Sequence, residues 1–297
     1  MKSDQTGTIR LAAGRVVRET FEVTTADGVR IFVATKYVPG MENKQAVLLL
    51  HPGNGLGHIY WDLPLSGYSV MDYLAQHSFR VFALDSRGFG DSEHPQRVTY
   101  DGCSQDVEAV VKHIQRQYAF GKVNLIAMSH GATVASYFVG KNQDNIERLV
   151  LIGYQYKKRA GGEKAQQAVV DLVNKGVFYV HEKPSLEPGP EIYDSPPEVL
   201  QLYHDLIKQK NPTRTITIRT DEAGRDAGAA NIPHLRVPTL IIRGDHDINS
   251  QDDNLQCFRD IEAREKAYLE IGNAGHSSAR EKTRMVLFRA ILGWLTD

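Results

Sequence analysis

A serine flanked by small residues is the first feature whose residue types could do chemistry. An apolar segment at 123–128 runs into AMSHG at 127–131, and a helical pattern follows. A nucleophile on a sharp strand-to-helix turn needs small residues two positions away on each side, here Ala127 and Gly131. Such a turn directs the Ser129 hydroxyl toward a helix N-terminus, where developing negative charge is stabilised. The alternative is that Ser129 only caps the helix.

A glycine-rich loop follows an earlier apolar strand and is a candidate source of hydrogen bonds to the same centre. The loop lies in LLLHPGNGLGH, at 48–58. Acyl transfer needs backbone N–H donors for the oxyanion. We expect one donor from His130, the residue after the serine, and the second from Gly53, with Asn54 as the next choice. Pro52 has no N–H, and a simple glycine turn is the alternative interpretation.

A carboxylate and a histidine follow two later strands. The segment LIIRGDHD, at 240–247, ends where an open α/β sheet places residues that face a ligand, and Asp245 and Asp247 both qualify by type. His276 lies on a glycine-flanked loop before the last helical pattern. A near-neutral pKa suits a histidine to take the serine proton and return it to a leaving group. The joint occurrence of serine, acid and histidine indicates nucleophilic catalysis more strongly than any one of them.

The elements needed to position these residues are strands and helices that alternate along the chain. Short apolar runs of the type buried on both faces of a parallel sheet occur at 46–51, 81–85, 123–128, 149–153, 239–244 and 268–272. Helical patterns, with apolar residues three and four apart, occur at 69–77, 106–118, 133–140 and 280–295. This alternation predicts an α/β fold with a doubly wound, mostly parallel sheet. Asp27-Gly28 between β-rich runs predicts an N-terminal antiparallel hairpin at 16–38.

The interval between the strands at 149–153 and 239–244 is far longer than one crossover requires. It is rich in proline and polar residues, but it also contains a helical pattern at 198–210 and aromatic residues such as Tyr203. Disordered segments are poor in aromatic residues, so a long disordered loop is the less favoured alternative. We predict a mainly helical cap at 157–234, inserted into a core made of 1–156 and 235–297.

The chain of 297 residues has the composition of a globular protein, with 41% hydrophobic residues and a formal net charge of -1. No basic block stands out, so no nucleic-acid partner is expected. No stretch resembles a signal peptide or a membrane span, which predicts a cytoplasmic protein with no membrane association. Cys103 and Cys257 fit the reduced thiols of an intracellular enzyme. No metal-ligand or dinucleotide motif is found, so neither a metal nor a cofactor is expected, and a homodimer is compatible with the sequence.

Together these motifs resemble those of the α/β-hydrolase superfamily over nearly the whole chain. HPGNG resembles its oxyanion loop H-G-x-x-G, DSRGFGDS its D-x-R-G-x-G-x-S loop, and AMSHG its nucleophile elbow. GDHD resembles the G-x-x-D segment whose last residue is the acid of the triad, which selects Asp247 over Asp245. NAGH resembles the G-H segment that carries the histidine, which selects His276. Pro52 and Ala127 depart from the glycines that the family usually has at these positions.

The resemblance implies a serine hydrolase of the carboxylesterase type, which cleaves a small carboxylic ester, lactone or thioester through an acyl-enzyme on Ser129. Asn54, Trp61 and Tyr154 lie where they could contact this small-molecule substrate. Asp85, in the DSRGFGDS segment, is expected to have a structural role. Epoxide hydrolases and haloalkane dehalogenases of this fold use an aspartate nucleophile, whereas this elbow carries a serine. A carbon–carbon hydrolase, an acyltransferase, a lyase and a hydrolase-fold ligand-binding protein remain alternatives.

Overall fold

One eight-stranded sheet lies at the centre of the computed structural model, which describes residues 14–41, 45–53, 55–157, 162–177, 179–181, 191–212, 215–217 and 222–296. Its strands are β1 (Val17–Thr24), β2 (Arg30–Tyr37), β3 (Ala46–Leu50), β4 (Arg80–Leu84), β5 (Val123–Met128), β6 (Ile146–Ile152), β9 (Thr239–Gly244) and β10 (Lys266–Ile271). Their order across the sheet is β1-β2-β4-β3-β5-β6-β9-β10. The neighbours from β4 to β10 in this order are parallel, whereas β1 and β2 are antiparallel to their neighbours.

The N-terminal hairpin and the parallel centre confirm the predicted architecture. β1 and β2 pair from Val17 opposite Tyr37 to Thr24 opposite Arg30, around the turn at Asp27-Gly28. Gly28 has a φ of 86°, a conformation that glycine adopts without steric cost. The apolar run predicted as a further strand at 268–272 is β10.

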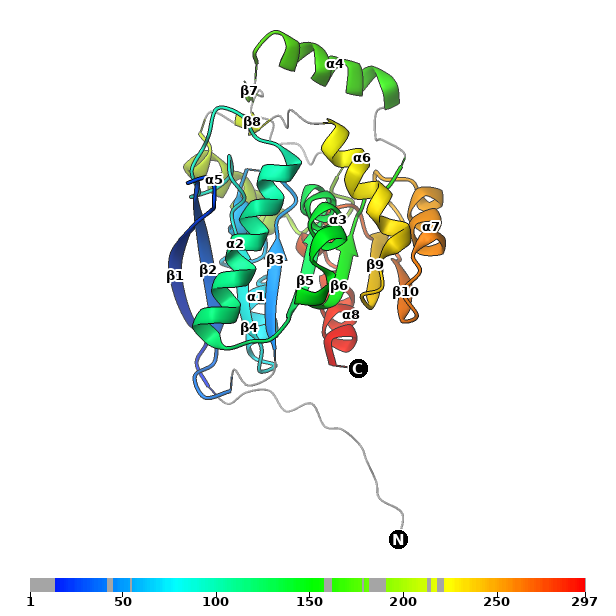
Figure 1. Cartoon of the computed structure of the whole chain (residues 1–297). Coiled ribbons are helices and arrows are strands. Elements are labelled where there is room, and N and C mark those ends of the chain that lie inside the picture. Colours follow the sequence, from blue (N-terminus) through cyan, green and yellow to red (C-terminus); the bar gives the residue numbers. More distant parts are fainter. Residues whose placement is uncertain are drawn as a thin grey trace.

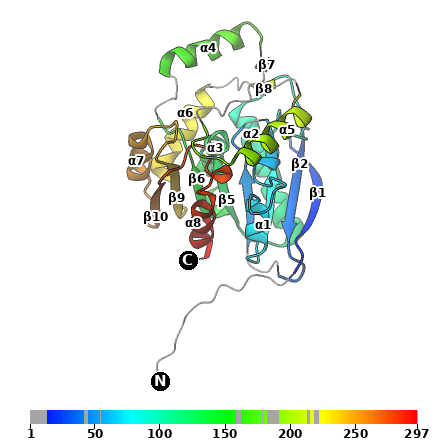
Figure 2. The ribbon, with the colours of Figure 1, turned by 180° about the vertical axis from the view of Figure 1, so that it is seen from behind.

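Two helical layers cover the sheet (Figures 1 and 2). The helices of one layer are α1 (Val70–Ala75) and α8 (Arg284–Thr296), and those of the other include α2 (Tyr100–Tyr118), α3 (His130–Asn142) and α7 (Gln251–Asp260). In β3, Leu48 and Leu50 belong to the core beneath α2 and α3, whereas Val47 and Leu49 belong to the core beneath α1 and α8. Successive side chains of a strand point to opposite faces, so a continuous apolar run is what a strand between two cores requires.

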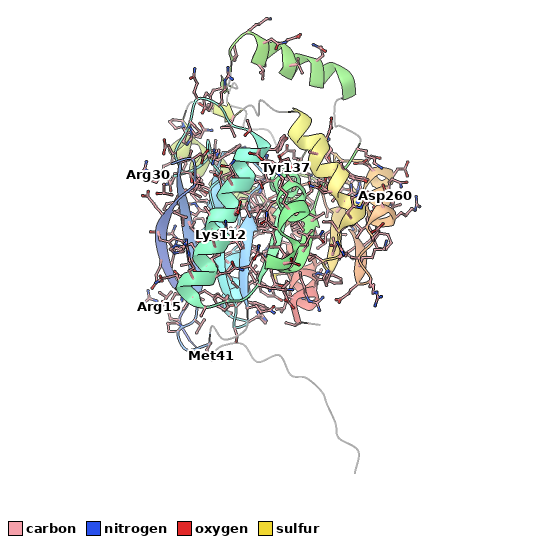
Figure 3. The ribbon with its side chains drawn as sticks, viewed as in Figure 1. Arg15, Arg30, Met41, Lys112, Tyr137 and Asp260 are labelled. Carbon is pink, nitrogen blue, oxygen red and sulfur yellow. The ribbon has the colours of Figure 1, made fainter. Side chains whose placement is uncertain are left out.

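The helices present polar side chains to solvent. Lys112 lies on the exposed side of α2 (Figure 3). It pairs with Glu108 one turn earlier at 2.6 Å. Within the described ranges, no helix combines the length and the apolar character needed to cross a bilayer. Cys103 and Cys257 are both buried, and neither is part of a disulfide bond.

The interval between β6 and β9 folds into helices and a small sheet. Its described elements are α4 (Gly162–Asn174), β7 (Tyr179–His181), α5 (Pro197–Lys210), β8 (Thr215–Thr217) and α6 (Glu222–Asn231), with β7 antiparallel to β8. The helix predicted at 198–210 is confirmed as α5. Tyr203 and Ile207 of α5 pack against Leu56, in the segment after β3. α6 packs beside α3, while α4 lies at the far end of the molecule (Figure 1). The limits of the cap at 157–234 stay a prediction, and part of this interval lies outside the described residues.

Candidate active site

Ser129 lies between β5 and α3 in a backbone conformation that non-glycine residues seldom adopt. Its φ is 51° and its ψ is -114°. Its N–H donates to the carbonyl of Ile152 at 2.9 Å, and its own carbonyl accepts the N–H of Thr133 at 3.1 Å as α3 begins. The Ser129 hydroxyl makes no capping hydrogen bond to the helix, so the capping alternative does not describe this residue. Such conformations cost about 1–3 kcal/mol and concentrate at functional sites.

Gly131 allows α3 to approach the end of β3 very closely. A Cβ atom on Gly131 would lie 2.7 Å from the carbonyl oxygen of Leu50 and 2.8 Å from that of His51. Only glycine fits there, because neither backbone oxygen belongs to a side chain that could rotate away. The close approach brings the start of α3 against the loop that follows β3, as the predicted oxyanion site requires.

Gly53, the predicted second oxyanion donor, is in contact with His130. A Cβ atom on Gly53 would lie 2.9 Å from the Cβ of His130, and the φ of Gly53 is 84°. The Gly53 N–H lies 3.0 Å from Nδ1 of His51, and the Ser86 N–H lies 3.2 Å from Nε2 of the same ring. A neutral imidazole accepts at only one nitrogen, so the tautomer with its proton on Nδ1 would leave the Gly53 N–H available to a substrate. Asn54 lies outside the described residues.

The side chain of His130 packs among aromatic rings. The ring centroids of Phe89, Tyr100 and His51 lie 5.2, 5.9 and 6.0 Å from that of His130. This packing holds the first residue of α3, whose backbone N–H is the other predicted oxyanion donor. The imidazole itself therefore packs among neighbouring rings next to the elbow.

Asp247 and His276 form a buried pair in the loops after β9 and β10. Nδ1 of His276 lies 2.9 Å from Oδ1 of Asp247, and the two side chains are only 3% and 1% exposed. A carboxylate only accepts, so Nδ1 carries the proton and Nε2 is left as the acceptor. Burial lowers the pKa of His276, but the hydrogen bond and the charge of Asp247 raise it, and the result is above the ordinary histidine value. The Asn249 N–H also donates to Oδ1 of Asp247 at 2.8 Å and fixes the carboxylate.

Gly153 brings this pair and Ser129 to the same end of the sheet. It directly follows β6, next to Ile152, whose carbonyl accepts the Ser129 N–H. A Cβ atom on Gly153 would lie 2.8 Å from Cε1 and Nδ1 of His276, and 3.1 Å from Oδ2 of Asp247. The three residues predicted as a triad therefore gather at the C-terminal end of β6, and their catalytic roles stay a prediction.

Glu281, which was not predicted as a site residue, holds the loop that carries His276. Its Oε2 accepts the N–H of Gly275 at 2.7 Å, and its Oε1 accepts the N–H of Tyr193 at 2.9 Å. The side chain is buried, and burial raises its pKa. The helical pattern predicted at 280–295 is confirmed as α8, but the helix begins only at Arg284, after the short turn η4 (Ser278–Arg280). Residues 280–284 are all polar, and the apolar spacing of the helix begins only at Met285, in keeping with this later start.

Trp61 and Tyr154, predicted to contact the substrate, lie in the two hydrophobic cores. Trp61 is fully buried beneath α1 and α8, with its ring centroid 5.0 Å from that of Tyr60. Tyr154 is buried beneath α2 and α3, and its hydroxyl donates to Ser136 Oγ at 3.1 Å. Both positions are those of core residues, and contact with a substrate stays a prediction for each.

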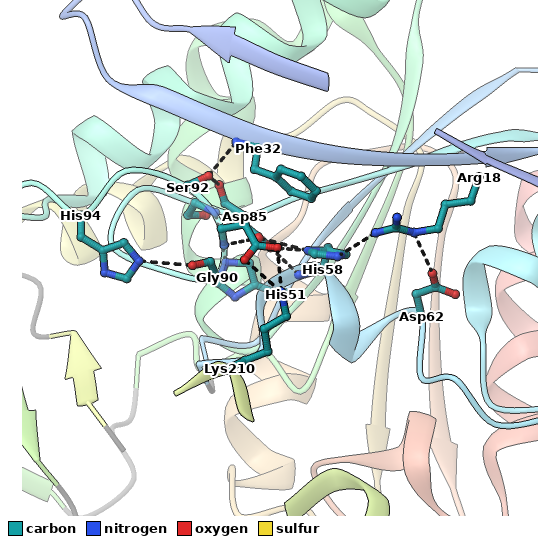
Figure 4. Close-up of polar contacts among 12 residues, drawn as sticks. Arg18, Phe32, His51, His58, Asp62, Asp85, Gly90, Ser92, His94 and Lys210 are labelled. Carbon is teal, nitrogen blue, oxygen red and sulfur yellow. Dashed lines mark hydrogen bonds and ion pairs between the residues drawn. The ribbon is translucent and has the colours of Figure 1, made fainter. Parts of the chain in front are cut away.

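Asp85 anchors two loops near the site, in agreement with the structural role expected of it (Figure 4). Its carboxylate accepts the N–H of His58 and, at 2.8 Å, that of Asp91, and it lies 3.0 Å from Nδ1 of His58. Among the described residues, His58, Asp85 and Asp91 are spaced closely enough to hold a metal ion. Arg18 lies 3.3 Å from Nε2 of His58, and Lys210 lies 3.1 Å from Oδ1 of Asp91. Because Arg18 and Lys210 already contact this cluster, we assign the cluster to anchoring the loops and not to binding a metal ion.

Comparison with known proteins places the chain among hydrolases. The family model described as serine aminopeptidase, S33 matches residues 43–283. The AB hydrolase superfamily protein YisY of Bacillus subtilis (strain 168) is 23% identical over 273 residues, which cover 85% of this chain and 92% of that protein. The solved structure of an esterase (EaEST) from Exiguobacterium antarcticum has a TM-score of 0.67 at 17% identity, with 93% of this chain and 99% of that chain covered. The 2-hydroxy-6-oxo-6-phenylhexa-2,4-dienoate hydrolase from Rhodococcus sp. strain RHA1 has a TM-score of 0.69 at 17% identity, with 95% and 100% covered.

The similarity to the solved structures establishes the fold. The match to the family model establishes that the chain belongs to that family. The matched residues begin just before β3 and end just before α8, so they include the elbow at Ser129 and the pair formed by Asp247 and His276. The chain belongs to the α/β-hydrolase superfamily, within the family described as serine aminopeptidase, S33.

Proposed function

We propose that this hydrolase cleaves a small carboxylic ester, lactone or thioester through a covalent acyl-enzyme on Ser129. The observation that carries the proposal is the Ser129 backbone, which is held at a φ of 51° while its hydroxyl makes no capping bond to α3. A fold retains a strained serine of this kind where the orientation of the hydroxyl is used. The esterase among the structures of the same fold supports an ester as the scissile group.

In the first half of the reaction, Ser129 Oγ attacks the carbonyl carbon while Nε2 of His276 takes the hydroxyl proton. Asp247 holds His276 in the tautomer that exposes Nε2 and stabilises the imidazolium that forms. The backbone N–H groups of His130 and Gly53 hold the negative charge that develops on the carbonyl oxygen. Collapse of the tetrahedral intermediate breaks the bond to the alcohol, which leaves with the proton from His276.

In the second half, water hydrolyses the acyl-enzyme. His276 takes a proton from the water as its oxygen attacks the acyl carbon, and the same N–H groups hold the oxyanion. Breaking the bond to Ser129 Oγ releases the carboxylic acid, and the proton on His276 returns to the serine. The enzyme is then in its starting state.

Labelling with a fluorophosphonate, followed by peptide mapping, tests the proposal. We expect the label on Ser129, a burst of product from activated esters, and neither signal with the Ser129→Ala variant. Esters, lactones, thioesters and aminoacyl amides are compared, the last because the family description names aminopeptidases. Normal turnover by Ser129→Ala would contradict the proposal. Labelling of Ser129 without turnover of any substrate would instead favour a hydrolase-fold ligand-binding protein.

A further inference from the structure

A buried arginine in the same loop as His276 has unused hydrogen-bonding capacity. Arg280 ends η4 and is 3% exposed. Its Nη2 donates to Ser277 Oγ at 2.6 Å. Its Nε and Nη1 have no hydrogen-bond partner in the part of the chain that the structure describes. The neighbouring carboxylate of Glu281 does not compensate for them, because its two oxygens accept the N–H groups of Gly275 and Tyr193.

Burying a guanidinium without an acceptor for its N–H groups is strongly unfavourable. The group is always charged and carries five N–H donors, and arginine is almost never fully buried unless it is paired. Cation–π contacts with Tyr203 and Tyr60 compensate in part, since their ring centroids lie 3.7 and 5.1 Å from the Arg280 Cζ. The Tyr60 hydroxyl is itself buried, and no described residue is its hydrogen-bond partner. Although burial lowers the pKa of Arg280, Tyr203 and Glu191 also act favourably on the charged guanidinium and raise this pKa. The Arg280 Nε and Nη1 and the Tyr60 hydroxyl nevertheless have no hydrogen-bond partner among the described residues.

We propose that Arg280 binds a carboxylate group carried by the substrate, so that the enzyme acts on esters that also bear a free acid. The planar guanidinium offers N–H groups in the spacing of the two carboxylate oxygens, and the Tyr60 hydroxyl adds a further donor. This inference rests on the proposed ester hydrolysis and names its substrate class.

The position of Arg280 favours a substrate group over a distant effector. Ser277, which accepts its Nη2 hydrogen bond, is the residue next to His276. Burial and the positive charge of Arg280 both lower the pKa of His276, against the raising effect of Asp247, so the two side chains are within electrostatic range. A carboxylate bound at Arg280 would therefore lie close to the loop that carries the proposed base. Tyr203 covers the guanidinium from α5, so entry of the carboxylate requires the Tyr203 side chain or the helix to move.

The competing explanation is that Arg280 only ties α5 to the loop of His276 through its stacking on Tyr203. A purely structural arginine would affect acidic and neutral substrates to the same extent. A carboxylate-binding arginine would affect the acidic substrate selectively. The ratio of kcat/KM between an acidic ester and its neutral isostere separates the two explanations.

Two substrate pairs place the carboxylate on either side of the ester. Monomethyl glutarate is compared with methyl 4-carbamoylbutanoate, and acetoxyacetate with acetoxyacetamide. We expect the wild type to prefer the acid in at least one pair by about 30-fold or more, the effect of removing one partner of a buried charge pair. Arg280→Gln should bring the ratio close to one. Arg280→Lys should give an intermediate ratio, because lysine keeps the positive charge but lacks the planar pair of N–H donors of the guanidinium.

Arg284→Gln is the matched control. Arg284 also stacks on a tyrosine, with its Cζ 3.7 Å from the ring centroid of Tyr68, but its Nε donates to the Gly67 carbonyl at 2.7 Å. Its hydrogen bonding includes a protein acceptor, so its replacement should leave the acid-to-amide ratio unchanged. The thermal unfolding midpoint of each variant shows whether it is folded.

Equal use of acid and amide by the wild type in both pairs would overturn the inference, as would an Arg280→Gln variant that loses both activities equally. If Arg280→Gln does not fold, the acid-to-amide ratio of Arg280→Lys tests the inference in its place.

If no ester is cleaved, the proposed function fails, and the inference is then tested separately by calorimetry with the Ser129→Ala variant. Binding of monomethyl glutarate and not of its amide, weakened when Arg280→Lys is added, supports the carboxylate site. Equal binding of the two overturns it.

Discussion

Gly153 lies against the imidazole ring of His276, at a distance that leaves no room for a Cβ atom on this glycine. The preceding residue, Ile152, accepts the N–H of Ser129. One short stretch at the end of β6 therefore positions the predicted nucleophile on one side and the predicted base on the other. A change in this stretch should disturb both groups at once.

Replacing Gly153 with alanine should reduce kcat/KM by about 100-fold or more, because the added methyl group displaces His276 and a misplaced catalytic group costs that much. Stability should also fall by about 1 kcal/mol, since alanine is strained at the φ of 54° found here. Gly28→Ala is the control, because Gly28 has a φ of 86° and no atom within 4 Å of its Cβ position. It should lose similar stability in urea and keep full activity. A fully active Gly153→Ala variant would show that the close contact is irrelevant to catalysis.

Replacing Ser129 with glycine should give an inactive protein that is more stable than Ser129→Ala. Glycine relieves the strain at a φ of 51°, worth about 1–3 kcal/mol, but loses about 0.5–1 kcal/mol in chain entropy. The net difference in unfolding free energy between the two variants should be about 1 kcal/mol, measured by urea denaturation. Equal midpoints would mean that the elbow stores no strain.

Replacing Asp247 with asparagine should reduce kcat by roughly 10⁴-fold, because the wrong tautomer of His276 is then favoured. His276 acts as a base only when it is neutral, and Asp247 raises its pKa. The acidic limb of the kcat/KM profile should therefore lie above the ordinary histidine value of 6.5 in the wild type and move to lower pH in the variant.

Asp245→Asn is the matched control for this profile. The carboxylate of Asp245 accepts the N–H groups of Asn273 and Ala274, both at 3.0 Å, and it is not the partner of His276 in the structure. Its replacement should weaken the loop without moving the acidic limb. A shift with Asp245→Asn, and none with Asp247→Asn, would reverse the assignment of the acid.

Replacing Glu281 with glutamine should lower both stability and activity. The carboxylate accepts two backbone N–H groups, whereas the amide can accept at only one of these places and presents N–H to the other. The unmet buried donor should cost about 1–3 kcal/mol of unfolding free energy. Activity should fall by about tenfold, as the loop with His276 loosens. Glu108→Gln, at an exposed pair with Lys112, should change stability by less than about 1 kcal/mol and leave the activity unaltered.

The features that could be predicted from the sequence have local signals. The strands are predictable because a strand buried on both faces, such as Ala46–Leu50, reads as a continuous apolar run, and the hairpin because Asp27-Gly28 fits a tight turn. The elbow was predicted because the small residues around Ser129 are required by the turn itself. Asp247 was selected over Asp245 only through the family motif, and the structure pairs that residue with His276.

The features that could not be predicted depend on loops that meet in space. Nothing in the sequence near Glu281 indicates that its carboxylate will reach Tyr193, because that contact joins segments far apart along the chain. The sequence places Arg280 and Glu281 in the first turn of a predicted helix, which indicates no role at the site for either residue. The role of Gly153 was equally hidden, since a glycine at the end of a strand is common and only the position of His276 gives it meaning.

The tight fit of Gly131 against Leu50 and His51 also indicates which changes the protein can tolerate. With no space between the elbow and the loop after β3, larger residues at 127–131 cannot be absorbed by small local shifts. Directed evolution toward new substrates should therefore recover few active clones from this segment. Productive changes should instead accumulate on α5, whose Tyr203 stacks on Arg280 in the loop that carries His276.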